Sequence, residues 1–157
     1  NLNYNEIYGS YAGAMGTPQF MPESYIKYGV DYDQDGSVDL WNSKYDIYAS
    51  VANYLIKKGW EKDQPIYKDI EIKKEYISEI FSTGDVKTIP VEDNFLNKIL
   101  VNNKNLHTGK KYLALLSKKN EEYKLVYKNF KVIMTYNIST FYAMVVATLS
   151  EKISIKK

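Results

Sequence analysis

The sequence predicts an α+β protein in which helices near both ends flank a strand-rich middle. Apolar residues recur at helical spacing in residues 43–58 and 140–153. Four segments have the alternation, or the β-branched and aromatic composition, of strands: residues 65–72, 111–118, 122–128 and 130–136. A chain of 157 residues is one ordinary domain, with or without a small insert, and can bury a core without disulfides.

The composition excludes several classes of protein. With 45% apolar and 25% charged residues, the chain resembles folded globular proteins and not disordered ones. It has no cysteine, which excludes disulfides and thiolate metal sites. All 21 basic residues are lysines and the net charge is only +2. Nucleic acid is therefore not the expected partner, because arginine is the usual reader of base edges. No apolar run approaches the roughly 18 residues of a membrane span.

The first 60 residues combine a glycine-rich loop with two predicted helices. Residues 9–22, GSYAGAMGTPQFMP, carry three glycines and two prolines, which predicts a tight loop whose backbone passes close to another segment. A short helix is expected over residues 23–28. A longer helix is expected over residues 43–58, with Gly59 as its stop signal. Its apolar residues recur at the spacing of an amphipathic helix: Ile47, Tyr48, Val51, Ala52 and Leu55.

The remainder is basic and mixes strands with helices. Residues 73–82 look weakly helical and residues 90–101 are mixed. The three later strands are expected to be joined by a turn at Lys119, Asn120 and Glu121 and a tighter one at Asn129. Ser139 is a predicted N-cap for the final helix. Its apolar stripe is formed by Tyr142, Val145, Val146, Leu149 and Ile153, broadened by Ala143, Met144 and Ala147.

Residues 31–42, DYDQDGSVDLWN, match the pattern of an EF-hand-like calcium loop. Hard cations need several oxygen ligands, and a glycine at the sixth position permits the sharp turn. The expected ligands are the carboxylates of Asp31, Asp33 and Asp35, the backbone carbonyl of Ser37, and Asp39 through water. Asn42 stands where a bidentate glutamate is usual, so Asp46 is the expected closing ligand. The alternative is a solvated acidic turn without a metal.

Two blocks of the sequence resemble the membrane-bound lytic murein transglycosylase B family of bacterial cell-wall enzymes. The first runs from the AGAMG-x-PQFMP string through the acidic loop to SVANYL-x-x-x-GW, and the second is FKVIMTYNISTFYAMVVATLSE. The resemblance implies part of a lysozyme-like helical core in residues 1–60, with the calcium loop at 31–46. It further implies a small β-containing insert in residues 61–129, and a returning strand and C-terminal helix of the core in residues 130–157.

The resemblance also implies an activity. The family cleaves the β-1,4 bond between N-acetylmuramic acid and N-acetylglucosamine without water, leaving 1,6-anhydro ends, and a single carboxylic acid suffices. That glutamate lies on a helix with an E-T-x-x-G motif upstream of the glycine-rich loop, whereas this chain opens at Asn1. We therefore expect the catalytic acid upstream of Asn1, in a chain that is a mature product, a fragment or a trimmed piece. Glu6 and Glu23 are weak substitutes.

The groove positions that carry over from the family are residues of the glycine-rich loop and of the last corner. The expected sugar-binding residues are Ser10, Gln19, Phe20, Tyr136, Asn137 and Tyr142. For Phe20 and Tyr142 a role in core packing stays open, because aromatics after a turn or on a helix are often core. No organic cofactor is expected.

The implied partners are peptidoglycan glycan strands and the missing N-terminal part of the same enzyme. The implied location is the periplasm of the bacterial envelope, with a lipid anchor possible through a missing N-terminus. Two alternatives from other classes stay open: a non-catalytic wall-binding module and a calcium-dependent structural domain.

Overall fold

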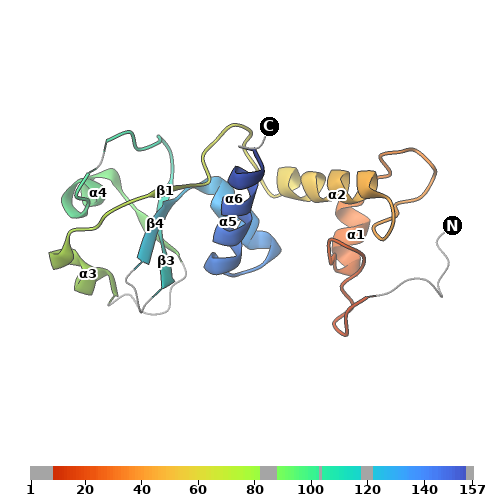
Figure 1. Ribbon diagram of the computed structural model, residues 1–157, viewed down its shortest axis with the longest axis horizontal. Helices are drawn as coiled ribbons and strands as arrows, with labels where there is room; N and C mark the ends of the chain where they lie inside the picture. The colour runs from red at the N-terminus through yellow and green to blue at the C-terminus, as the bar shows by residue number, and fades with distance from the viewer. Residues whose placement is uncertain (1–8, 82–87, 103, 118–121, 155–157) are drawn as a thin grey trace. The chain divides into compact units, whose positions relative to one another are not determined.

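The computed structural model describes residues 9–81, 88–102, 104–117 and 122–154, and the chain divides into two units, residues 1–60 and 61–157 (Figure 1). Each unit is described by itself. Glu6 and the predicted turn at residues 119–121 lie outside the described residues. The predicted division of the later residues at 129/130 falls within the second unit and stays a prediction.

The first unit contains two helices joined by the acidic loop, drawn in orange in Figure 1. Helix α1 spans Pro22–Tyr28 and helix α2 spans Lys44–Lys57, as the sequence predicted to within one residue. Ser43 caps α2, its hydroxyl accepting a hydrogen bond from the Asp46 N–H. Gly16 lies so close to Leu40 that an added Cβ would be 2.5 Å from the Leu40 carbonyl oxygen. The close backbone approach expected in the glycine-rich loop is therefore present.

The buried face of α2 differs from the predicted apolar stripe. Its buried residues are Asp46, Ser50 and Tyr54, whereas Tyr48 is 69% exposed. The polar groups on this face bind the backbone of the preceding segment. Asp46 accepts from the N–H groups of Tyr32 and Asp39, Ser50 accepts from Val30, and Asn53 donates to the Tyr28 carbonyl. These hydrogen bonds give a partner to the backbone groups of Tyr28, Val30, Tyr32 and Asp39, which would otherwise go unpaired.

The second unit contains a four-stranded antiparallel sheet with the order β1-β4-β3-β2. Its strands are β1 (Tyr67–Asp69), β2 (Thr88–Val91), β3 (Lys111–Ser117) and β4 (Glu122–Val126). Helices α3 (Lys74–Phe81) and α4 (Asp93–Ile99) belong to the same unit. The sheet and these helices share a core whose buried members are Ile80, Leu96, Ile99, Leu100, Leu113, Tyr123, Leu125 and Tyr127. The strands expected within 65–72, 111–118 and 122–128 and the helix expected over 73–82 are confirmed.

The strand predicted over residues 130–136 is wrong. This segment belongs to helix α5, Lys128–Tyr136, and Asn129 lies in the first turn of that helix, where a tight turn between strands was expected. Five of its residues are buried: Asn129, Phe130, Val132, Ile133 and Met134. Three consecutive buried residues do not fit the two-residue alternation of a half-exposed strand. The β-branched composition favoured a strand, but burial against the rest of the unit decided for a helix.

Helix α6, Thr140–Ser154, is confirmed together with its cap, because the Ser139 hydroxyl accepts a hydrogen bond from the Tyr142 N–H at 3.2 Å. The expected core stripe is confirmed only in part, because Val145, Leu149 and Ile153 are exposed. Ala143 and Ala147 are fully buried, and the helix packs against α5 and β3 on that side. The opposite side exposes four large apolar residues spaced four apart: Phe141 at 69%, Val145 at 49%, Leu149 at 55% and Ile153 at 59%.

No single helix among the described residues has the length and hydropathy of a membrane span. Helices α5 and α6 meet those criteria only when taken together, across a bend of 113°.

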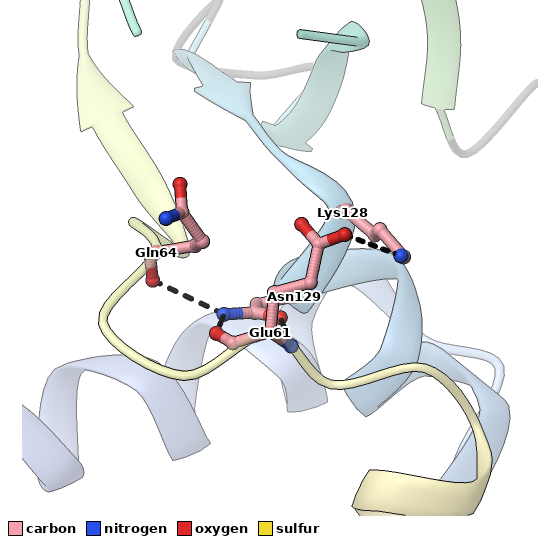
Figure 2. A network of polar contacts seen from close by, with 4 residues as sticks. All are labelled: Glu61, Gln64, Lys128 and Asn129. Carbon is pink, nitrogen blue, oxygen red and sulfur yellow. Dashed lines mark hydrogen bonds and ion pairs between the residues drawn. The ribbon is translucent and has the colours of Figure 1, made fainter. Parts of the chain in front are cut away.

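A buried asparagine joins the two ends of the sheet region. Asn129 is fully buried, and its amide accepts from the Glu61 N–H at 2.9 Å and donates to the carbonyls of Glu61 and Gln64 at 2.8 and 3.1 Å (Figure 2). At the surface of the same network, Lys128 forms an ion pair with Glu61. The segment that enters the sheet is thereby fixed to the helix that leaves it. Sequence reasoning missed this role, since a lone asparagine carries no pattern that marks it as buried.

Candidate functional site

The glycine-rich loop is an ordered pair of turns held by its own backbone. Met15 exchanges two hydrogen bonds with Phe20, Met15 N–H to the Phe20 carbonyl at 2.7 Å and the reverse at 3.0 Å. Ser10 closes the first turn, because its hydroxyl accepts from the Ala14 N–H at 3.1 Å. The loop therefore presents its exposed polar groups from a defined backbone.

Gln19 is the most constrained of the predicted sugar-binding residues. Its φ of 55° lies in the left-handed region, which a residue with a side chain rarely adopts. Its side chain is exposed, and its NH2 group donates to the Gly16 carbonyl at 2.9 Å, which fixes the amide. The amide carbonyl oxygen can accept a further hydrogen bond. Backbone strain that surrounding contacts maintain is typical of ligand-binding positions.

Phe20, for which binding and packing were both open, is a core residue. Its side chain is only 2% exposed, and its ring lies 5.8 Å from the ring of Tyr54. Tyr54 in turn contacts Tyr28 edge-on at 4.8 Å. Phe20 therefore anchors the loop in the core of the first unit. It could contact a sugar directly only if its ring left this aromatic cluster.

The other three predicted sugar-binding residues lie at the corner between α5 and α6. Tyr136 is the last residue of α5 and is half-buried, while Asn137 follows as its C-cap and is exposed. Tyr142 is half-buried in the first turn of α6. This corner belongs to the second unit, whereas Ser10, Gln19 and Phe20 belong to the first. The two groups are thus each local, and their joint role as one groove stays a prediction.

The acidic loop brings three carboxylates together. One oxygen from each of Asp31, Asp33 and Asp35 lies within 4.8 Å of the others. Asp31 Oδ2 accepts from the Gly36 N–H, but its Oδ1 is buried and has no hydrogen-bond partner. A buried carboxylate oxygen without a partner is costly, and a cation would satisfy it. The donor set and this oxygen both fit a hard metal ion such as calcium.

The remaining predicted ligands have additional contacts. Ser37 donates its N–H and its hydroxyl to Asp35 Oδ1, both at 2.9 Å. Asp46 is 1% exposed, and its two oxygens accept from Tyr32 and Asp39. Asp46 therefore anchors the loop to α2, a role that sequence reasoning did not assign, and its role as a metal ligand stays a prediction.

Asp39 is held by the turn that follows it. Its Oδ1 accepts from the N–H groups of Trp41 and Asn42 at 2.8 and 2.9 Å. Burial alone would raise the pKa of this carboxyl, but the hydrogen bonds from Asn42 and Trp41 outweigh it and lower the pKa. Asp39 is thus a carboxylate at neutral pH that stabilises the turn leading into α2.

Glu23 does not have the environment of a general acid. Its side chain is exposed, and a hydrogen bond and the positive charge of Lys27 lower its pKa from the ordinary value. A carboxyl that donates a proton to a leaving group needs a raised pKa, which burial or a like charge provides. Glu6, the other weak substitute, lies outside the described residues.

Comparison with known proteins gives consistent matches over nearly the whole chain. Residues 1–151 match the family described as the transglycosylase SLT domain. The membrane-bound lytic murein transglycosylase B of Escherichia coli (strain K12) is 33% identical over 159 residues, which cover 95% of this chain and 40% of that protein.

Solved structures agree with the sequence match. The catenated lytic transglycosylase SltB1 from Pseudomonas aeruginosa superposes with a TM-score of 0.81 at 32% identity, covering 99% of this chain and 51% of that chain. The Escherichia coli lytic transglycosylase Slt35 in complex with calcium gives a TM-score of 0.73 at 31% identity, covering 94% and 46%. The chain spans about half of the length of these relatives, or less.

Proposed function

The chain belongs to the transglycosylase SLT family, and on that premise we propose that it is the part of a peptidoglycan lytic transglycosylase that holds the glycan strand. The observation that carries this proposal is the match over residues 1–151 together with the strained, exposed amide of Gln19 within it. Its carbonyl oxygen can accept a hydrogen bond from the acetamido N–H of an amino sugar. The cell envelope is the location that this substrate requires.

In this proposal the proton donor belongs to polypeptide outside residues 1–157. The acid protonates the glycosidic oxygen as the bond to C1 breaks, and the sugar's own 6-hydroxyl then attacks C1 while giving its proton to the same carboxylate. Water is not consumed, and the product carries a 1,6-anhydro ring. Within the first unit, the polar groups of Ser10 and Gln19 would hold and orient the sugar. The sugar-binding roles of Tyr136, Asn137 and Tyr142 in the second unit stay a separate prediction.

The chain alone should bind glycan without cleaving it. We expect no release of 1,6-anhydromuropeptides from purified peptidoglycan, measured by chromatography and mass spectrometry. Chitotetraose, in contrast, should bind measurably in calorimetry, and Gln19→Ala should weaken that binding about tenfold by removing one orienting amide. Thr17→Ala, an exposed change in the same loop, is the control. Release of anhydro products would contradict the absent acid, and binding that Gln19→Ala leaves unchanged would contradict the groove.

We also propose that the acidic loop binds calcium as a structural ion. Asp31, Asp33 and Asp35 would supply carboxylate oxygens, and Ser37 a backbone carbonyl. Four aspartates between residues 31 and 39 repel one another, and a divalent cation removes that repulsion. The Slt35 structure in complex with calcium supports the choice of metal. The ion would hold the loop and the start of α2 in place and take no part in the proton transfers.

We propose further that the exposed apolar side of α6 is a docking site for other polypeptide. Phe141, Val145 and Leu149 line a groove of about 570 Å³ with Met144 and Leu116. Exposed apolar surface of this kind marks a contact with other polypeptide. The relatives are about twice as long as this chain, and we propose that transglycosylase polypeptide beyond residues 1–157 packs into this groove.

The double change Val145→Lys/Leu149→Lys distinguishes an open groove from one filled by other polypeptide. In residues 1–157 alone, thermal melting should be nearly unchanged, because both side chains are about half exposed. In a longer transglycosylase that includes these residues, the same change should cost about 3–5 kcal/mol, because two charges would be buried without partners. Lys152→Ala, at the rim, should be neutral in both. Equal shifts in the two proteins would contradict the docking of polypeptide in this groove.

A further inference from the structure

Three exposed tyrosines lie beside the acidic loop, outside the predicted groove. Tyr32 is 64% exposed, Tyr45 55% and Tyr48 69%. None of their hydroxyls has a hydrogen-bond partner among the described residues. A single exposed tyrosine is ordinary. Three neighbouring ones form a patch of exposed aromatic rings, and such patches mark interaction sites. We call these three residues the tyrosine surface.

The rings of the tyrosine surface are held close together by the backbone. The rings of Tyr32 and Tyr45 are nearly parallel, with centroids 6.5 Å apart and planes at 20°. Tyr48 follows Tyr45 by three residues on α2, a spacing that places both on one side of a helix with about 5–6 Å between Cβ atoms. Tyr32 is fixed to the same helix, because its N–H donates to the buried carboxylate of Asp46 at 2.8 Å.

We propose that the tyrosine surface binds pyranose rings of a neutral glycan chain. A pyranose offers a face of C–H bonds that packs on an aromatic ring, and its hydroxyls can hydrogen-bond to tyrosine hydroxyls at the ring edges. The Lys44 ammonium lies 5.4 Å from the centre of the Tyr45 ring and can donate to sugar hydroxyls. Exposed, nearly parallel rings suit a linear polymer better than a small enclosed ligand.

Local charge selects among polymers. Tyr32 stands between Asp31 and Asp33 in the acidic loop. Residues 1–60 as a whole hold four lysines against seven acidic residues. Even with a divalent cation in the acidic loop, this unit has no excess of positive charge that would attract a polyanion such as nucleic acid, whereas N-acetylglucosamine carries no charge. Together with the proposed function, this charge balance favours a β-1,4-linked glycan of N-acetylated amino sugars as the occupant.

This inference rests on the proposed function, because a glycan-holding chain gains from a second contact with the same polymer. Two weak sites on one strand raise the effective concentration of glycan at the groove. The tyrosine surface would thus retain a long strand between binding events. It makes no contribution to bond cleavage.

The test compares ring removal with hydroxyl removal, using chitohexaose in calorimetry and pelleting with insoluble peptidoglycan. Tyr45→Ala/Tyr48→Ala should weaken chitohexaose binding about tenfold and reduce the pelleted fraction of protein. Tyr45→Phe/Tyr48→Phe keeps the ring faces and should stay within about threefold of the parent. Ile26→Ala, an exposed apolar truncation on α1, should bind as the parent does. Thermal melting of each variant verifies the fold.

The outcomes separate this inference from the proposed function. Unchanged binding by the alanine pair, or a parent chain that does not bind chitohexaose, overturns the tyrosine surface. If Gln19→Ala abolishes binding while the alanine pair does not, the groove stands and the tyrosine surface falls. If the alanine pair weakens binding and Gln19→Ala does not, the tyrosine surface stands and the groove falls. An equal loss in the phenylalanine and alanine pairs overturns binding through ring faces.

Discussion

Replacing Asn129 with leucine is expected to lower the free energy of unfolding by about 2–4 kcal/mol. Leucine has nearly the same shape, so the change deletes hydrogen bonds and leaves little cavity. The Glu61 N–H and the carbonyls of Glu61 and Gln64 all lose their partner, and each of the three hydrogen bonds contributes about 0.5–1.5 kcal/mol. Urea unfolding followed by far-ultraviolet circular dichroism measures the loss.

The same network supplies the control for this prediction. Lys128→Ala removes only the ion pair to Glu61, whose side chains are 53% and 48% exposed. An exposed pair of this kind contributes at most about 1 kcal/mol. If both variants unfold at the same urea concentration, the buried amide is not what holds the entry of the sheet region to α5.

The second large effect concerns Asp46 and Asp35, two carboxylates of one loop with different expected dependence on calcium. Asp46→Asn should destabilise the chain by about 2–3 kcal/mol with or without calcium. An amide can accept only one of the two N–H groups that Asp46 now accepts, and its own NH2 faces the other. Asp35→Asn retains an acceptor for Ser37, so in chelator it should be within about 0.5 kcal/mol of the parent.

Calcium should separate the two variants. With the ion at a hundredfold excess over its dissociation constant, the parent gains about 2.7 kcal/mol, and Asp35→Asn should lose most of that gain. Both tryptophans, Trp41 and Trp60, lie in the first unit, so tryptophan fluorescence during unfolding reports on the unit that contains the loop. If chelator leaves the parent unchanged, the loop is an acidic turn without a structural metal.

Local patterns predicted most helices and strands, but not which faces are buried. Ser139 and Ser43 mark helix starts that the structure confirms, because N-caps depend on a few neighbouring residues. The segment after Asn129 was assigned to a strand, since its composition is β-branched and its burial depends on contacts distant in sequence. On α6 the small residues Ala143 and Ala147 are buried, which a hydrophobicity pattern cannot distinguish from the larger apolar residues beside them.

The candidate site was likewise predictable only where its features depend on neighbouring residues. The spacing of the aspartates placed three carboxylates together, because a short loop restricts where alternate residues can lie. The resemblance directed attention to Gln19, but its left-handed backbone is visible only in three dimensions. The anchoring roles of Asp46 and Asn129 depend on backbone groups 7 and 68 residues away in the chain, and no local pattern encodes such partners.

The way α2 holds the acidic loop restricts insertions and deletions in this part of the chain. Tyr32 and Asp39 are both tied to Asp46, and Val30 is tied to Ser50, one turn later on the same helix. Adding or deleting a residue between Val30 and Tyr32 would shift one tether relative to the helical pitch of 5.4 Å and break it. Asp33 is tied to the start of the same helix, because its Oδ2 accepts a hydrogen bond from the hydroxyl of Ser43, the N-cap of α2. The spacing that brings the carboxylates of Asp31, Asp33 and Asp35 together restricts the length of the rest of the loop in the same way.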